Sequence, residues 1–236
     1  MQALTRLARA FDTAADRGTP LPVWWRDDDA VDVGPRLERT MALAADAGAT
    51  IALAVIPAGV TDRLLTWTAG RAHLLQHGVA HTNHQRTGKS AELGNARRAD
   101  AIAAALIAAR AALEVPHFVP TVVPPWNRMR DDLAPHLAAA GYTGVSLFGA
   151  APSHTPLTRV DTHIDPVAWR TDRSLATDAA LCDMVDRALG QGGPIGLLTH
   201  HAVETDAVHD FVKEFVNLVA RHPGAAWTDA AALFAR

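Results

Sequence analysis

The side chains best suited to catalysis gather in three short clusters of acids and histidines. Asp27, Asp28 and Asp29 follow an apolar stretch, and the segments A-H-T-N-H (80–84) and L-L-T-H-H (197–201) follow two others. Adjacent carboxylates repel one another, so a fold that gathers them needs a cation or bound protons to compensate. Taken alone, the three acids are equally typical of a solvated loop. Together with the two histidine clusters, they favour a metal site.

One of the three acids, together with His81 and His84, provides the ligand count of a catalytic divalent ion. Such an ion usually takes three protein ligands from histidine and carboxylate side chains and leaves one position open for water. An H-x-x-H pair alone is more often a surface pair, but the nearby acids favour a ligand role here. We expect one divalent ion, zinc in the first place, with cobalt, nickel and manganese as alternatives. His73 and His77, by contrast, are expected to pack or form hydrogen bonds around the strand before this cluster.

Alternating strands and helices must position the clusters. Apolar runs predict strands at 23–26, 50–56, 117–122, 144–148 and 195–199, a short strand before the histidines of 80–84, and an extended segment at 160–164. Helical spacing of apolar residues predicts helices at 1–18, 35–47, 61–69, 91–113, 131–140, 177–189 and 207–219, and a short last one after Asp229. This alternation predicts a mostly parallel sheet with helices outside it, either an open doubly wound sheet or a barrel. In both architectures active residues gather at the carboxyl ends of strands, where all three clusters fall.

Composition limits the possible classes of protein. The 236 residues are 49% apolar, enough for a sizeable core, and no linker or repeat interrupts them, so we expect one domain over residues 1–236. The net charge of −3 and the lack of a basic block argue against a general nucleic-acid binder. The single cysteine excludes an internal disulfide and a cysteine-based zinc cluster. We read no signal peptide and no run of the ~20 apolar residues that cross a bilayer, so we expect a cytoplasmic protein without a membrane partner. The oligomeric state stays open.

The clusters, in their order and spacing, resemble those of the polysaccharide deacetylases, the NodB-homology or carbohydrate esterase family 4 group. That family has an Asp-Asp pair after its first strand, in which the first acid is the catalytic base and the second a metal ligand. R-D-D-D (26–29) resembles this pair, with Asp27 as base and Asp28 as ligand in the simplest register and Asp28 with Asp29 in the next. The family's H-[ST]-x-x-H motif, in which both histidines bind metal, resembles H-T-N-H (81–84), which is one residue shorter.

A third family motif, R-x-P-[YW], resembles V-P-P-W (123–126) in Pro125 and Trp126, with valine in place of arginine. Arg26 and Arg128 are the candidates to supply the missing charge, and Arg128 is favoured slightly because it lies just past this motif. The aromatic face of Trp126 suits the apolar face of a sugar ring.

The last two motifs contain an acid with a tryptophan and a strand that ends in histidine. D-P-V-A-W resembles the first of them in Asp165 and Trp169, and Trp169 is a second candidate for stacking on a sugar. L-L-T-H-H resembles the second, which makes His200 the general acid and gives His201 a supporting role where the family often has Asp. Asp29 is counted with the supporting residues.

The resemblance covers roughly residues 23–201 and implies a fold and an activity. The implied fold is of the α/β class, a distorted (β/α) barrel of about seven strands of the glycoside hydrolase and deacetylase type. The implied activity is metal-dependent hydrolysis of an N-acetyl or similar acyl group on a sugar or amino sugar. Asp27 would activate water and His200 would protonate the departing amine, and a cytoplasmic enzyme favours a small or nucleotide-linked amino sugar as substrate. The alternatives are a metal-dependent amidase or esterase acting on a non-sugar substrate, and an inactive carbohydrate-binding relative.

Overall fold

The computed structural model describes residues 1–149 and 156–235, whose contacts divide the chain into two units. Unit 1 comprises Met1–Asp27, Gly34–Ile51 and Thr162–Ala230, and unit 2 comprises Asp28–Val33, Ala52–Asp161 and Ala231–Arg236. Strand β1 (Leu21–Ala30) belongs to both units, because the boundary between them falls after Asp27.

The strands follow the hydrogen-bonding order β6-β5-β4-β3-β2-β1-β7, and β8 also pairs with β1. The pairs β1–β7, β1–β8, β3–β4, β4–β5 and β5–β6 are all parallel. Parallel neighbours need crossover connections, and helices provide most of them, as the alternating pattern in the sequence predicts. None of the helices in the described residues is long and apolar enough to cross a membrane.

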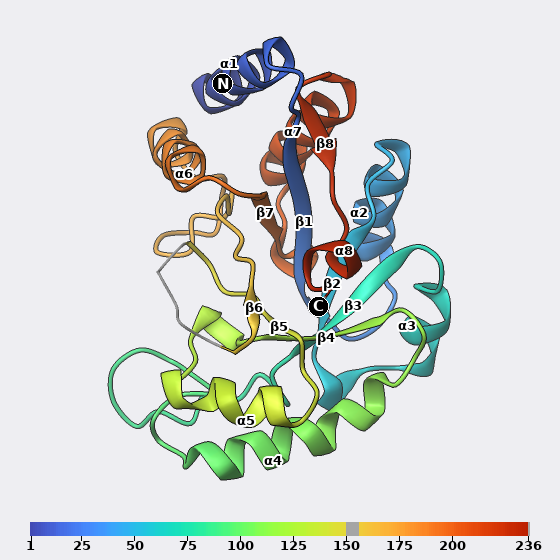
Figure 1. The fold of residues 1–236 in the computed structure, drawn as a ribbon, viewed down its shortest axis with the longest axis vertical. Coiled ribbons are helices and arrows are strands. Elements are labelled where there is room, and N and C mark those ends of the chain that lie inside the picture. The colour runs from blue at the N-terminus through green and yellow to red at the C-terminus, as the bar shows by residue number, and fades with distance from the viewer. Residues whose placement is uncertain (150–155, 236) are drawn as a thin grey trace. The chain divides into compact units, whose positions relative to one another are not determined.

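Unit 1 is built from the first part of β1 and two short parallel neighbours, with helices formed by strongly amphipathic segments. Its strands are β7 (Ile195–Thr199) and β8 (Ala225–Trp227), and its helices are α1 (Gln2–Asp16), α2 (Pro35–Asp46), α6 (Asp178–Gln191) and α7 (Asp206–Arg221). Helix α1 packs against α6 and α7 (Figure 1). The core is rich in aromatic side chains, because Phe11, Trp24, Trp25, Phe211 and Phe215 are all buried.

Unit 2 carries most of the sheet. Its strands are β2 (Ile51–Val55), β3 (Ala72–His77), β4 (Phe118–Val123), β5 (Gly144–Val145) and β6 (Thr158–Arg159), and its helices are α3 (Asp62–Trp67), α4 (Ala99–Arg110) and α5 (Ala134–Ala139). Helices α4 and α5 run beside one another (Figure 1). Residues of α4, α5, β4 and β5 share one apolar cluster that includes Leu106, Val122, Leu137 and Val145. The short helix α8 (Ala230–Leu233) ends the chain.

Four predicted elements differ clearly from the observed ones. The extended segment predicted at 160–164 contains only isolated bridges, such as that of Ile164 with Leu197, and strand β6 covers Thr158–Arg159 instead. Strand β1 does not end at Arg26 but runs through all three acids, because β7 stays paired with it as far as Asp27. The helix predicted from residue 91 begins only at Ala99, because Leu93 forms a bridge with Met129 and so commits this backbone to a non-helical path. The strand predicted at 144–148 is only two residues long, and β8 was not predicted at all.

Candidate functional site

Strand β1 carries three acids in succession and places them in different surroundings. Asp27 and Asp28 are 0% and 1% exposed, whereas Asp29 is half-buried. Side chains alternate between the faces of a strand, so Asp27 and Asp28 point to opposite faces. Asp29 has a backbone φ of 71°, in the left-handed region that residues other than glycine rarely adopt. Both features separate the three carboxylates, which reduces the repulsion expected of them in a single loop.

Asp27 forms a buried acid–histidine pair with His201 inside unit 1. Nδ1 of His201 lies 2.5 Å from Oδ1 of Asp27, and the backbone N–H of His201 donates to Oδ2 at 3.0 Å. The hydroxyl of Thr199 also donates to Oδ2, at 2.6 Å, while Nε1 of Trp25 donates to that hydroxyl at 2.8 Å. The strand register explains this group, because it places Asp27 opposite Thr199 in the β1–β7 pair. Unit 1 alone therefore supplies Asp27 with three hydrogen-bond donors.

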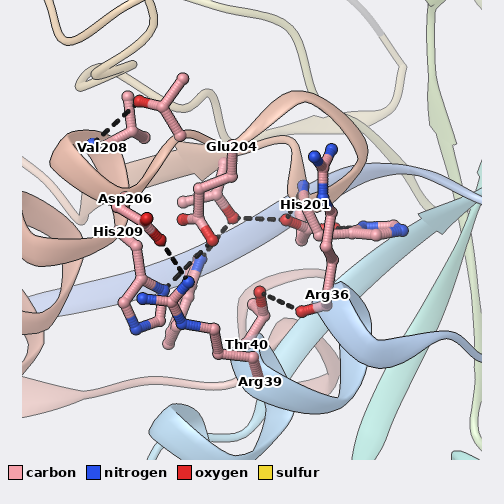
Figure 2. Close-up of polar contacts among 12 residues, drawn as sticks. Arg36, Arg39, Thr40, His201, Glu204, Asp206, Val208 and His209 are labelled. Atoms are coloured by element: carbon pink, nitrogen blue, oxygen red, sulfur yellow. Dashed lines mark hydrogen bonds and ion pairs between the residues drawn. The ribbon is translucent and has the colours of Figure 1, made fainter.

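The turn that begins at His201 leads to another buried acid and histidine (Figure 2). Oε2 of Glu204 lies 3.2 Å from Nδ1 of His209, and Arg36 donates to a carbonyl of the turn. Burial raises the pKa of Glu204, the hydrogen bond with His209 lowers it, and the nearby charge of Asp27 raises it again. These contacts fix the turn that carries His201.

Asp165, Trp169 and His200 form a second cluster in unit 1, which we call the tryptophan cluster. Nε1 of Trp169 donates to Oδ2 of Asp165 at 2.7 Å, and the backbone N–H of Val167 donates to Oδ1 at 3.0 Å. The rings of Trp169 and His200 meet edge to face, with centroids 4.7 Å apart. Trp169 is 43% exposed, so part of its indole is open to a ligand. The structure thus brings together three residues that were predicted from two separate motifs.

One group of three acid and histidine side chains in residues 1–149 and 156–235 has its ligand atoms within 4.8 Å of one another, and it consists of Asp29, His77 and His81. We call this group, which lies entirely in unit 2, the metal cluster. Oδ1 of Asp29 lies 3.2 Å from Nε2 of His77 and 3.4 Å from Nε2 of His81. The ends of strands β1 and β3 supply Asp29 and His77, and the loop after β3 supplies His81.

The hydrogen bond on the far side of His77 shows what the metal cluster is suited to hold. Nδ1 of His77 lies 2.9 Å from the carbonyl oxygen of Val123 and must donate, because a carbonyl can only accept. In the neutral ring, Nε2 then presents a lone pair to Asp29, and two acceptors at this distance need a metal ion or a proton between them. Burial lowers the pKa of His81, and the neighbouring His77 lowers it further, so the neutral form of the ring is favoured. Two histidines and one carboxylate match the ligands of a divalent ion such as zinc, and an imidazole held from behind by a carbonyl is the usual arrangement of a zinc ligand.

Strained backbone surrounds the metal cluster. His81, Trp126 and Asn127 have φ values of 54°, 56° and 54°, in the same left-handed region as Asp29. Such conformations cost about 1–3 kcal/mol each and persist where the surrounding structure enforces them, often at functional sites. The ring centroids of Trp126 and His81 are 4.3 Å apart, so the aromatic side chain predicted to contact a sugar lies directly beside the metal cluster.

The observed metal cluster and the predicted ligand set of Asp28, His81 and His84 have only His81 in common. Nε2 of His84 lies 3.3 Å from Nη1 of Arg97 instead. His77 was expected in the first place to pack or form a hydrogen bond around its strand, with a role in the site as the less favoured alternative, and the structure places it in the metal cluster. A sequence signal for it exists, because His77 and His81 have the full H-x-x-x-H spacing of the family motif, which H-T-N-H lacks.

The two arginines considered for the missing motif charge have different positions. Nη1 of Arg128 donates to the backbone carbonyl of Ser90 at 2.7 Å. Arg26 is fully buried, and because it precedes Asp28 by two residues on β1, both side chains lie on the same face of the strand. Pro125 is buried against Gly78.

Similarity to known proteins lies in the structure rather than in the sequence. No family model and no curated protein matches the chain. A solved CE4 esterase from Streptococcus mutans has a TM-score of 0.62 and 13% identity, over 92% of this chain and 89% of that one. A family 4 carbohydrate esterase from Streptomyces lividans, in complex with acetate, has a TM-score of 0.56 and 13% identity, over 85% and 88% of the two chains. A mutant of a CE4 family pseudoenzyme with restored enzymatic activity has a TM-score of 0.61 and 14% identity, over 91% of this chain and 68% of that one.

At these identities the likeness is one of fold. It confirms the predicted resemblance at that level, since the parallel strand order and the surrounding helices match those of the solved esterases. The chain has the fold of the family 4 polysaccharide deacetylases, a distorted (β/α) barrel.

Proposed function

We propose that this chain is a metal-dependent hydrolase that removes an acyl group, in the first place N-acetyl, from a sugar or amino sugar. The observation that carries the proposal is that the side chains of Asp29, His77 and His81 lie together in a chain with a deacetylase fold. Asp28, the residue before Asp29, provides a second carboxylate next to this group in the sequence. Acyl transfer from nitrogen needs a base for water, a charge opposite the developing oxyanion and an acid for the amine. Each of these tasks has a candidate among the described residues.

The metal cluster is the proposed site of the divalent ion, with Asp29, His77 and His81 as its ligands. When bound, the ion supplies a Lewis acid for the acyl carbonyl and lowers the pKa of water near it towards neutrality. His77 keeps its ligand nitrogen aimed at the cluster because its other nitrogen is bound to Val123. Zinc is the first choice for this set of ligands, and cobalt, nickel and manganese are alternatives.

Asp28 is the proposed base, which corresponds to the second of the two registers open in the sequence. It is adjacent to the ligand Asp29, as the first acid of the family pair is to the second, and it lies within unit 2. Asp27 is engaged by Thr199 and His201 instead. Asp28 accepts the proton of the attacking water, and Arg26, which is buried on the same face of β1, is the cation that we propose takes the place of the missing motif arginine.

His200 is the proposed acid. A departing amine leaves poorly without a proton, and His200 ends the β7 strand in the position of the family acid. Trp169 and Asp165 orient it through the ring contact and the hydrogen bond of the tryptophan cluster. His201 holds Asp27 and supports the same turn.

The indole rings of Trp126 and Trp169 are the proposed contacts for the sugar. Trp126 lies against His81, and Trp169 against His200, so each ring adjoins one proposed catalytic group. Aromatic faces stack on the apolar faces of sugar rings. A carbohydrate partner also agrees with the similarity to a family 4 carbohydrate esterase.

An inactive carbohydrate-binding relative is the second candidate. Two observations favour it, namely the valine at position 123 in place of the motif arginine and the similarity to a CE4 family pseudoenzyme. Metal content separates this candidate from the enzyme.

The experiment measures both metal and activity. Protein purified without chelators is analysed for bound metal, reconstituted with each of the four ions, and assayed for acetate release from N-acetylated sugars and from non-sugar amides and esters. We expect one ion per chain and metal-dependent release from sugars. Activity on non-sugar substrates alone indicates the amidase or esterase, and metal-free protein that binds sugars without hydrolysing them indicates the inactive relative.

A further inference from the structure

Glu92 is a buried carboxylate to which the proposed mechanism gives no role. It is 1% exposed and lies in unit 2, in the segment predicted as the start of a helix. Its Oε1 accepts hydrogen bonds from the backbone N–H groups of Ala80 at 2.9 Å and Thr82 at 3.4 Å. Its Oε2 accepts from the N–H of Val79 at 3.0 Å. The donors are two of the three residues between His77 and His81, together with the residue after His81.

The turn between the two histidines is packed directly on this carboxylate. Gly78 has a φ of 62°, and a Cβ atom placed on it would lie 1.9 Å from Oε2 of Glu92 and 2.6 Å from Cγ of Pro125. Real Cβ contacts are practically never shorter than 3.0 Å. The turn therefore leaves no room for a side chain at position 78 beside the carboxylate of Glu92. On its other side the carbonyl of Gly78 accepts a hydrogen bond from the buried Gln76 at 3.0 Å.

We propose that Glu92 is a positioning residue of the metal cluster, whose three backbone hydrogen bonds hold the 78–82 turn so that His77 and His81 meet at Asp29. The proposal rests on the proposed metal site. Hydrogen bonds from N–H groups to a carboxylate are roughly twice as strong as those between neutral groups. His81 adopts its unfavourable left-handed backbone only because the turn on either side of it is fixed. Without Glu92 the turn is less ordered in the metal-free protein. Metal binding must then order the turn, and this loss of conformational entropy weakens the affinity for the ion.

Glu92→Gln tests the proposal with little change in volume. The amide keeps one acceptor oxygen but turns an NH₂ group towards a backbone N–H, so at least one of the three hydrogen bonds is lost. Asp161→Asn is the matched control. Asp161 is also a buried carboxylate of unit 2 that accepts from a backbone N–H, that of Leu147 at 2.9 Å, and it pairs with Arg159, so these two partners lie outside the 78–82 turn.

The measurements are the affinity of the metal-free proteins for Zn²⁺ and Co²⁺ by calorimetry, the visible spectrum of bound Co²⁺, and the melting temperature without metal. Partners that orient metal ligands typically contribute 10–100-fold to metal affinity. We therefore expect Glu92→Gln to bind both ions at least ~10-fold more weakly and with a changed Co²⁺ spectrum. Asp161→Asn should melt at a lower temperature yet bind metal within about twofold of wild type, because its lost contacts lie outside the turn.

Three results overturn the proposal, and a substitute variant serves for the first of them if Glu92→Gln does not fold. The first is a Glu92→Gln variant that binds metal as tightly as wild type, and the second is an equal loss of affinity in Asp161→Asn, which would reveal a general effect of stability. If Glu92→Gln does not fold, Glu92→Asp takes its place in the experiment, because it keeps the charge but shortens the side chain by one methylene. Wild-type metal affinity in Glu92→Asp also contradicts the proposal. The third is wild-type protein that binds neither ion, which removes the proposed metal-dependent function as well, whereas the first two leave that function intact.

Discussion

The metal cluster of unit 2 and the acid–histidine pair of unit 1 use the same kinds of side chain for different ends. Asp27 receives hydrogens from a hydroxyl, a backbone N–H and an imidazole nitrogen, all from unit 1. Asp29 faces the ligand nitrogens of two histidines, one of which has its hydrogen committed to Val123. The first arrangement stabilises a turn, whereas the second places one carboxylate and two histidine nitrogens within 4.8 Å of one another. Burial of an acid beside a histidine is therefore common to both arrangements, and the direction of the hydrogen on the histidine is what distinguishes them.

Removal of His77 is expected to have the largest effect on the metal cluster and tests its difference from the acid–histidine pair most directly. His77→Ala takes away one of three proposed ligands, and a lost ligand should cost more than the 10–100-fold typical of a residue that only orients one. We expect Zn²⁺ affinity to fall more than ~100-fold and activity to vanish. His84→Ala is the control, because His84 contacts Arg97 and lies outside the metal cluster, so its metal affinity should stay within about twofold of wild type. The opposite ranking by calorimetry would restore the ligand set of Asp28, His81 and His84.

The second prediction compares the two neighbouring acids of β1. Asp28→Asn should lower kcat by about 10²–10⁴-fold while the protein keeps its metal, because a general base contributes that much to the rate. Asp27→Asn should act mainly on stability, since the amide cannot accept all three hydrogen bonds that Asp27 accepts. Steady-state kinetics, metal analysis and melting curves on both variants distinguish these effects. A metal-loaded, stable Asp27→Asn protein with the larger loss of kcat would make Asp27 the base, the simplest register of the sequence.

The third prediction compares the histidines at the end of β7. His200→Ala should lose at least ~100-fold in kcat and keep its metal, as expected for a general acid. His201→Ala should lose much less kcat, because its ring serves Asp27 rather than the substrate. The reverse ranking, or loss of metal from His200→Ala, would show that the acid has been assigned to the wrong histidine.

The sequence predicts most of the sheet, and of the three residues in the metal cluster it names only His81 among its candidate ligands in the simplest register. Both ends of strand β7 are predicted correctly, because a short apolar run between clear turn residues is typical of a buried strand. The same rule predicts that β1 ends at Arg26, which is too early. The pairing of β7 with β1 extends to Asp27, and the local sequence of β1 contains no sign of this pairing. His77 lies at the last residue of a strand, where a packing role is the usual one, and only its four-residue spacing from His81 points to metal. Glu92 has no local signal at all, since its partners are set by contacts between segments distant from it in the chain.

The smallest effect on metal affinity is expected from a change in the core of unit 2 that reaches the metal cluster only through other residues. Tyr142, the one tyrosine of the sequence, is fully buried in unit 2, where its hydroxyl donates to Oε1 of Gln76 at 2.6 Å. Gln76 in turn donates to the carbonyl of Gly78, at the start of the turn between His77 and His81. Tyr142→Phe removes the hydroxyl that contacts Gln76 and, at 3.2 Å, the carbonyl oxygen of Leu106, so it should cost about 1–3 kcal/mol in the free energy of unfolding. Its metal affinity should change less than about threefold.

The pH dependence of stability gives this last prediction a direct readout. Burial raises the pKa of Tyr142 to about 12, from an ordinary value of 10.0. Below pH 10 both the folded and the unfolded chain keep the phenol proton, so the contribution of Tyr142 to stability is fully present. Between pH 10 and about 12 only the unfolded chain loses it, which lowers the free energy of unfolding by up to about 2–3 kcal/mol. Urea unfolding across this range should show the fall in wild type and a smaller one in Tyr142→Phe, which titrates the same lysines and arginines but no phenol. Because this phenol is the only one in the chain, tyrosinate absorbance reports it alone, and ionisation of the folded protein at an ordinary pH would show that the core under the metal cluster is open to water.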